Sequence, residues 1–254
     1  MTSAAEKARD LKALRKQINA LDLDRVCVEK QQTSPDPEHM LKHGFHECVG
    51  RDEQDFSTVL GFALAAAGRM QKDLSKPVLV CSLADNAQEY GALYPCGLSA
   101  FGIDFADILS VEVRKEQDLY WVAEECLSSD ALSAVILTGG YKEKTYDFTI
   151  SRRLKLRSEE SSIPLYLIRN WKQSDATAAN GRWRVRRMES TENALVTPGR
   201  ALPGLPRFQV QLEKPVSSSN QVWIYEYDAT CGFRLAAPLA NRPPRKAKTI
   251  RRAA

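Results

Sequence analysis

The sequence predicts an α/β protein whose mostly parallel sheet has helices on both faces and is extended by C-terminal antiparallel strands. Between residues 57 and 168, continuous apolar runs alternate with helical segments, the pattern of strands buried on both faces. After Asn170, polar and apolar residues alternate at period two, which is typical of antiparallel strands with one wet face. The chain has 254 residues with 43% hydrophobic content, enough for one α/β core and a small addition.

The N-terminal part, residues 1–37, is expected to be a helix followed by a linker. Residues 5–21 carry apolar side chains at the 3-4-3 spacing of a short seam, namely Leu11, Leu14, Ile18 and Leu21. This seam could pack on the chain's own domain or on a partner helix, and the first is favoured because two heptads are few for a coiled coil. Residues 30–37 have the composition of a linker.

A short strand ending at Gly50 and an apolar helix beginning near Ser57 form the setting of a P-loop without its working residues. A working loop is G-x-x-x-x-G-K-[ST], in which the second glycine lets backbone N–H groups surround phosphate and the lysine reaches its oxygens. Counted from Gly50, Asp55 replaces the second glycine and Phe56 replaces the lysine, while Ser57 keeps the hydroxyl. Three carboxylates in this loop face a single arginine, so that it should repel a triphosphate.

The alternating segments that follow are expected to supply the rest of the parallel sheet. Strands are predicted at 77–83, 108–113, 132–137 and 164–168, and helices at 57–69, 88–101, 118–127 and 147–160. A P-loop ATPase would also need a carboxylate at the end of a core strand, but strand 132–137 is followed by Thr138 and two glycines. The nearest acid, Asp85, follows strand 77–83, and we interpret it together with Asn86 as a helix N-cap.

Neither the histidines nor the cysteines predict a metal site or a disulfide. His39, His43 and His46 have the i, i+4, i+7 spacing of zinc ligands on one helix, with Cys48 nearby. Two upstream prolines and Gly44 argue against a continuous helix, and His46 is expected in the strand that enters the loop. We therefore favour partly exposed loop histidines over a metal site. The six cysteines form no C-x-x-C pair, and several lie in apolar runs, which predicts buried reduced thiols. No catalytic residues and no cofactor are indicated.

The C-terminal strands are expected at 182–186, 207–213, 221–227 and 233–236, either extending the parallel sheet, which is favoured, or forming a small sheet of their own. On the first of them Arg182, Arg184 and Arg186 share one face, while Trp183 and Val185 face the core. Three guanidinium groups in a row could follow a phosphate backbone. They could equally form a solvated face that discourages edge pairing, and both interpretations stay open.

The excess of positive charge belongs to the last residues. The net charge is +4, and after Asn241 there are six basic residues and no acid: Arg242, Arg245, Lys246, Lys248, Arg251 and Arg252. With those six taken from 36, 30 Lys and Arg remain against 32 Asp and Glu. Residues 241–254 are predicted to be a disordered basic arm with weak, sequence-independent affinity for DNA.

No part of the sequence suggests a membrane. No apolar run approaches the roughly 20 residues that span a bilayer, and the N-terminus lacks the apolar core of a secretory signal. We therefore expect a cytoplasmic protein with no membrane partner.

Several short stretches, in order and spacing, resemble ImuA, the family of RecA-like accessory proteins of bacterial SOS-induced mutagenesis. They are residues 45–50, 60–65, 77–80, 149–156, 181–185, 204–212, 227–235 and 239–243, so that the resemblance covers about residues 41–243. The resemblance implies a RecA-like domain at 38–240, with antiparallel strands from about residue 181. It also implies a role in translesion synthesis and contact with an ImuB-like protein, with RecA and an error-prone C-family polymerase as further candidate partners.

The leading hypothesis is a non-enzymatic adaptor in the response to DNA damage, which recruits or regulates a translesion polymerase complex. Relative to RecA, the departures at Asp55, Phe56 and Thr138 argue against ATP hydrolysis. The segment 171–181, where RecA has a DNA-binding loop, carries one lysine, so DNA binding is not indicated there. Two alternatives stay open: a residual ATPase with a nonstandard loop, and a SulA-like division inhibitor, whose family shares the core without an ATP site.

Overall fold

The computed structural model describes residues 37–139, 145–169, 176–190, 204–214, 222–228 and 230–236. The predicted N-terminal helix and linker, up to residue 36, and the predicted basic arm at 241–254 lie outside the described residues. Those two expectations therefore stay predictions.

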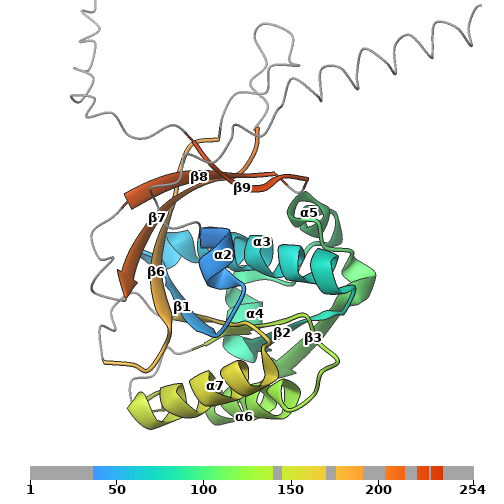
Figure 1. Cartoon of the computed structure of the whole chain (residues 1–254), viewed down its shortest axis with the longest axis vertical. Coiled ribbons are helices and arrows are strands. Elements are labelled where there is room, and N and C mark those ends of the chain that lie inside the picture. The colour runs from blue at the N-terminus through green and yellow to red at the C-terminus, as the bar shows by residue number, and fades with distance from the viewer. Residues whose placement is uncertain are drawn as a thin grey trace, which may run out of the picture. The chain divides into compact units, whose positions relative to one another are not determined.

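The described strands form one nine-stranded sheet in the order β3-β2-β4-β5-β1-β6-β7-β8-β9 (Figure 1). They are β1 (Phe45–Val49), β2 (Val78–Leu83), β3 (Ile108–Val113), β4 (Ala134–Thr138), β5 (Leu165–Arg169), β6 (Gly181–Arg187), β7 (Arg207–Lys214), β8 (Val222–Asp228) and β9 (Gly232–Leu235). From β3 to β6 all neighbours are parallel, and from β6 to β9 they are antiparallel. The predicted α/β class, with a parallel sheet and an antiparallel C-terminal extension, is confirmed.

The direction of β6 differs from the prediction. It was expected to be antiparallel, but it runs parallel to β1 and begins the antiparallel part only through its other neighbour, β7. Its alternating pattern is present, with Trp183 and Val185 buried and Arg182, Arg184 and Arg186 less so. Alternation reports that one face of a strand is covered and the other wet, and it carries no information on strand direction.

Helices cover both faces of the parallel part of the sheet (Figure 1). The main ones are α3 (Phe56–Leu74) on one face and α6 (Glu116–Leu127) and α7 (Phe148–Ser161) on the other, with the short helices α2 (Pro37–Leu41), α4 (Ala84–Tyr90) and α5 (Pro95–Leu98) and 3-10 turns at 53–55, 99–101 and 105–107. Two hydrophobic cores result, one around α3 and one under α6 and α7. The predicted covering of both faces is therefore confirmed for the parallel strands.

The antiparallel strands curl around α3, which is why that helix is apolar on almost every side (Figure 1). The ring of Phe62, in the middle of α3, lies 6.0 Å from Trp183, 5.9 Å from Phe208 and 5.3 Å from Phe233, measured between centroids. A Cβ atom on Gly68 would come within 2.1 Å of the Phe101 carbonyl oxygen, so the helix can approach that loop only with glycine there. The extension and the parallel core thus share one hydrophobic interior.

The single helix predicted at 88–101 was wrong, because the structure has three short pieces there. Helix α4 begins at Ala84, directly after β2, and ends at Tyr90, and α5 begins at Pro95. Gly91 adopts a positive φ of 81°, which ends α4, and Pro95 starts the next helix because its fixed φ suits a first helical position. The early start places Asp85 inside the first turn of α4, so its predicted role as N-cap was also wrong.

Candidate functional site

The loop between β1 and α3 has the backbone setting of a phosphate site, but a carboxylate of the chain fills it. Asp55 is buried, and its Oδ2 accepts the backbone N–H of Arg51 at 3.1 Å, while its Oδ1 accepts the backbone N–H of Arg187 at 3.3 Å. In a working P-loop, backbone N–H groups of this kind point at phosphate oxygens. Here they already have an anion as acceptor, supplied by the residue that stands in place of the second glycine.

The rest of the loop is shaped around that carboxylate. Asp52 caps the short 3-10 turn by accepting the Gln54 N–H at 3.1 Å, and it pairs with the Arg51 guanidinium at 2.9 Å. A Cβ atom on Gly50 would lie 2.9 Å from the Asp55 Cβ, so only glycine lets the loop close this tightly. The loop is a compact, internally satisfied turn.

The position of the missing lysine is occupied by an aromatic stack. Phe56 begins α3, and its ring stacks on that of Tyr90 with centroids 3.9 Å apart and planes 16° from parallel. Beside it lies a hollow of about 260 Å³, including open solvent, whose lining residues include Asp52, Glu53 and Arg169. Ser57, which with Gly50 matches the P-loop pattern, is exposed on α3.

The magnesium side of the site carries no carboxylate at the strand end. Strand β4 ends at Thr138, whose carbonyl accepts a 2.9 Å hydrogen bond from the Asn86 Nδ2. The Thr138 hydroxyl is buried and has no hydrogen-bond partner among the described residues. Asp85 is exposed. Asn86 therefore ties α4 to β4, a role that differs from the predicted cap.

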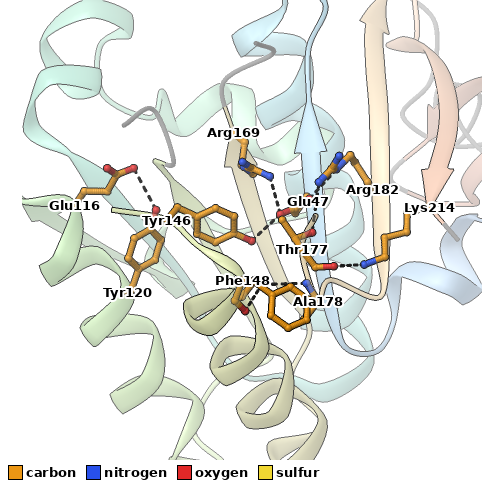
Figure 2. A network of polar contacts seen from close by, with 11 residues as sticks. Glu47, Glu116, Tyr120, Tyr146, Phe148, Arg169, Thr177, Ala178, Arg182 and Lys214 are labelled. Atoms are coloured by element: carbon orange, nitrogen blue, oxygen red, sulfur yellow. Dashed lines mark hydrogen bonds and ion pairs between the residues drawn. The ribbon is translucent and has the colours of Figure 1, made fainter. Parts of the chain in front are cut away.

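A buried ion cluster is centred on Glu47 of β1, and the sequence analysis did not predict it (Figure 2). Glu47 is 0% exposed, in the middle of a strand whose five residues are all buried. Its Oε1 accepts hydrogen bonds from the Tyr146 hydroxyl at 2.6 Å and from Arg169 at 2.9 Å, and its Oε2 accepts one from Arg182 at 2.8 Å. One carboxylate thus joins β1 to β5, to β6 and to the segment before α7.

Aromatic and hydroxyl groups continue the cluster toward α6 (Figure 2). The Arg169 guanidinium lies 4.5 Å above the centroid of the Tyr146 ring, and the Tyr120 ring lies 5.6 Å from that of Tyr146. The Tyr120 hydroxyl donates to Glu116 at 3.1 Å. Burial, reinforced by the Glu47 carboxylate, raises the pKa of Tyr146 well above its usual range, so this hydroxyl stays a neutral donor.

At the other end the cluster reaches the antiparallel extension. Lys214, the last residue of β7, donates to the carbonyl oxygen of Thr177, and the Arg182 Nη2 lies 3.4 Å from the Thr177 hydroxyl. Burial lowers the pKa of Lys214. A charge inside an apolar strand was the signal that could have revealed the cluster, because a buried carboxylate requires charged or hydrogen-bonding partners.

The three arginines on one face of β6 differ in their partners. Arg182 binds Glu47, and Arg184 binds Glu213 of β7 and donates to the Gly50 carbonyl at 3.1 Å. Arg186 has no ion pair with a described residue. Two of the three guanidinium groups are thus engaged with carboxylates, and the candidate phosphate contact on this strand is reduced to Arg186, with Arg187 beside it. The six basic residues at 242–252 lie outside the described residues.

The three histidines lie in different environments. His39 and His43 are exposed, whereas His46 is buried in β1, donating from Nε2 to the His43 carbonyl at 2.9 Å and accepting at Nδ1 from Trp183 at 3.3 Å. Burial lowers the pKa of His46 to about 4. Within the described part of the chain, no group of three His, Cys, Asp or Glu side chains could hold a metal ion. His46 lies in the strand that enters the loop, as predicted, and it is buried there.

Cys48, Cys81, Cys96 and Cys126 are free thiols, as predicted, but not all of the described cysteines are buried. Cys48 and Cys81 are buried, and burial raises the pKa of Cys81 to about 12. Cys126 and Cys231 are partly exposed, and Cys96 is exposed on α5, a helix too short to bury it. Cys27 lies outside the described residues.

Among the described helices, none has the length and apolar character that crossing a bilayer requires.

Comparison with models of known protein families, and with curated proteins, found no match for this chain. The resemblance to ImuA therefore stays a proposal, which rests on the residues and on the geometry of the loop.

Proposed function

We propose that this protein is a non-enzymatic adaptor with a RecA-like core, resembling ImuA, which acts in the cytoplasm during DNA-damage-induced mutagenesis. It recruits or regulates a translesion polymerase complex through an ImuB-like protein, and RecA and an error-prone C-family polymerase are its further candidate partners. The function lies in surfaces that bind other macromolecules.

The observation that carries the proposal is the position of Asp55. Its carboxylate accepts the backbone N–H groups of Arg51 and Arg187, at the place where a P-loop presents such groups to phosphate. A phosphate entering the loop would have to displace a buried carboxylate and would then meet Asp52 and Glu53. This arrangement supports a nucleotide-binding architecture that is kept for its fold and has lost nucleotide chemistry.

The arrangement of the chain supports the RecA-like assignment. The filled loop connects β1, the first described strand in the chain, to α3, as a P-loop connects a strand to a helix. In the sheet, β1 lies between β5 and β6. The antiparallel strands β7 to β9 follow the parallel part and share the α3 core with it. The fold does not require the loop to bind phosphate, because Asp55 and the Glu47 cluster stabilise the same region.

DNA contact is proposed as a weak, secondary activity. On the described surface it falls to Arg186 and Arg187, which make no ion pair with a described carboxylate, and beyond it to the basic segment 242–252. Six phosphate contacts to single strands predict a slope of about −4 for the logarithm of the binding constant against the logarithm of salt concentration.

The test is binding of the purified chain to a purified ImuB-like protein and to the RecA filament, measured by pull-down and by interferometry. The proposal expects saturable binding to at least the ImuB-like protein, unchanged by ATP and magnesium. Binding to neither protein contradicts it. Direct inhibition of the division GTPase by the chain would instead support the SulA-like alternative.

A further inference from the structure

Strand β3 is an open, apolar edge at one end of the described sheet (Figure 1). It hydrogen-bonds only to β2 among the described strands, and none of its six residues is buried. By contrast, four of the six residues of β2 and all five residues of β4, the next strand in the sheet, are buried. Leu109 is 48% exposed, and Trp121 on the neighbouring α6 is 62% exposed. An edge of this kind presents free backbone N–H and C=O groups to an added strand.

The surroundings of this edge are strongly acidic, in a chain whose net charge is positive. Between residues 104 and 130 there are eight acidic residues and two basic ones, and all of the acidic ones except Glu116 and Glu124 are exposed. Glu112 lies on β3 itself, Asp107 precedes the strand, and Asp118 and Glu125 lie on α6 beside Trp121. This charge selects a cationic occupant and disfavours pairing of β3 with the β3 of a second copy, which would bring acids against acids.

The chain contains a segment of the complementary charge. Residues 242–254 have six basic side chains, no acid, and small or apolar residues between them, such as Ala247 and Ile250. The described chain ends at Ala236, next to β9, the opposite edge of the sheet. Measured along the sheet, eight strand spacings of about 4.8 Å amount to about 38 Å, whereas the six residues from Ala236 to Arg242 extend over at most about 20 Å. A strand that uses the segment from Arg242 onward therefore falls short of β3 in the same molecule, where only the residues from about Lys248 onward could reach, and a second molecule has no such limit.

We propose that β3, with the exposed face of α6, binds residues 242–254 of a second copy of this chain, which adds to the open edge as an extended strand. The backbone edge provides the hydrogen bonds, and Glu112, Asp107 and Asp118 pair with the basic side chains. Because the same basic segment is the candidate DNA contact, single-stranded DNA and the β3 edge compete for it. Self-association then keeps the basic segment occupied until DNA is present.

The test uses the full chain and a fluorescent peptide of residues 241–254. Peptide binding is followed by anisotropy, and self-association of the chain by sedimentation velocity at low salt. Glu112→Lys reverses a charge on the edge strand, and the matched control is Glu160→Lys, which makes the same charge change on the exposed end of α7. We expect Glu112→Lys to weaken peptide binding about fivefold or more, since an exposed charge contact contributes of that order, and Glu160→Lys to leave it unchanged.

Mixing two variants makes the experiment decisive. The variant Lys246→Glu with Lys248→Glu should lose self-association, and an equimolar mixture with Glu112→Lys should regain it, because the intact basic segment of the second variant then meets the intact β3 edge of the first. Excess single-stranded DNA should dissociate the wild-type complexes. The proposal is overturned if the peptide binds Glu112→Lys and Glu160→Lys equally well, or if the wild-type chain stays monomeric at low salt at every concentration.

Discussion

The replacement Glu47→Ala should be one of the most destabilising single changes in the described core. It would leave Arg169, whose side chain is 1% exposed, and Arg182, 12% exposed, without the carboxylate that neutralises them, and it would remove the acceptor of the Tyr146 hydroxyl. Removing one partner of a buried ion pair lowers the free energy of unfolding by about 3–5 kcal/mol. For a domain of this size, that corresponds to a fall in melting temperature of roughly 6–20 °C.

The measurement is urea denaturation at neutral pH, followed by tryptophan fluorescence, to which the buried Trp183 contributes, and by circular dichroism. The matched control is Glu213→Ala, because its ion pair with Arg184 is about a quarter exposed on both sides, and such pairs contribute about 1 kcal/mol or less. Glu47→Gln keeps the volume and removes the charge, so its loss should fall between the two. A loss below about 1 kcal/mol for Glu47→Ala would refute the view that this carboxylate holds β1, β5 and β6 together.

Three further predictions concern single residues. Burial holds the pKa of His46 near 4, whereas the unfolded value is about 6.5, so the folded state favours the neutral ring. The free energy of unfolding therefore carries no penalty from His46 above pH 6.5, and it falls by about 3 kcal/mol as pH drops toward 4. Urea midpoints across this range should show a smaller acid loss for His46→Gln than for the exposed control His43→Gln, and equal losses would contradict the assignment. Asp55→Ala should lower the free energy of unfolding by about 2–4 kcal/mol, because two backbone N–H groups lose a buried acceptor, and a neutral result in urea denaturation would show that water replaces it freely. Arg186→Ala should weaken single-stranded DNA binding more than Arg184→Ala, because the Arg184 guanidinium is already paired with Glu213. Deleting residues 242–254 should flatten the salt dependence of DNA binding. An unchanged slope in anisotropy titrations would show that this segment does not contact DNA.

The parallel core could be predicted from the sequence because its signals are local. Each buried strand is a short apolar run, and each crossover helix has its own pattern, so that most predicted boundaries lie within a few residues of those observed, as for β3 and α7. The loop substitutions at Asp55 and Phe56 were visible because a P-loop is defined by residue types at fixed spacing. That Asp55 turns inward and accepts N–H groups from two segments could not be read from spacing alone.

What the sequence did not reveal depends on contacts between distant segments. The direction of β6 is set by its pairing with β1, more than 130 residues earlier in the chain, and no local pattern records that choice. The arginines of β6 looked equivalent, but Glu47 lies beside the first and Glu213 beside the second. Glu47 itself carried a readable signal, as a carboxylate within a fully buried strand, although its three partners come from separate parts of the chain.

The central claim, that a retained fold carries a phosphate loop closed by its own carboxylate, is tested most directly by a nucleotide titration. Isothermal titration of the purified chain with ATP and magnesium should show no saturable binding at millimolar nucleotide, and ATP should not raise the melting temperature. Binding at micromolar concentration that Ser57→Ala weakens would contradict the account, because the loop would then be open to phosphate in spite of Asp55.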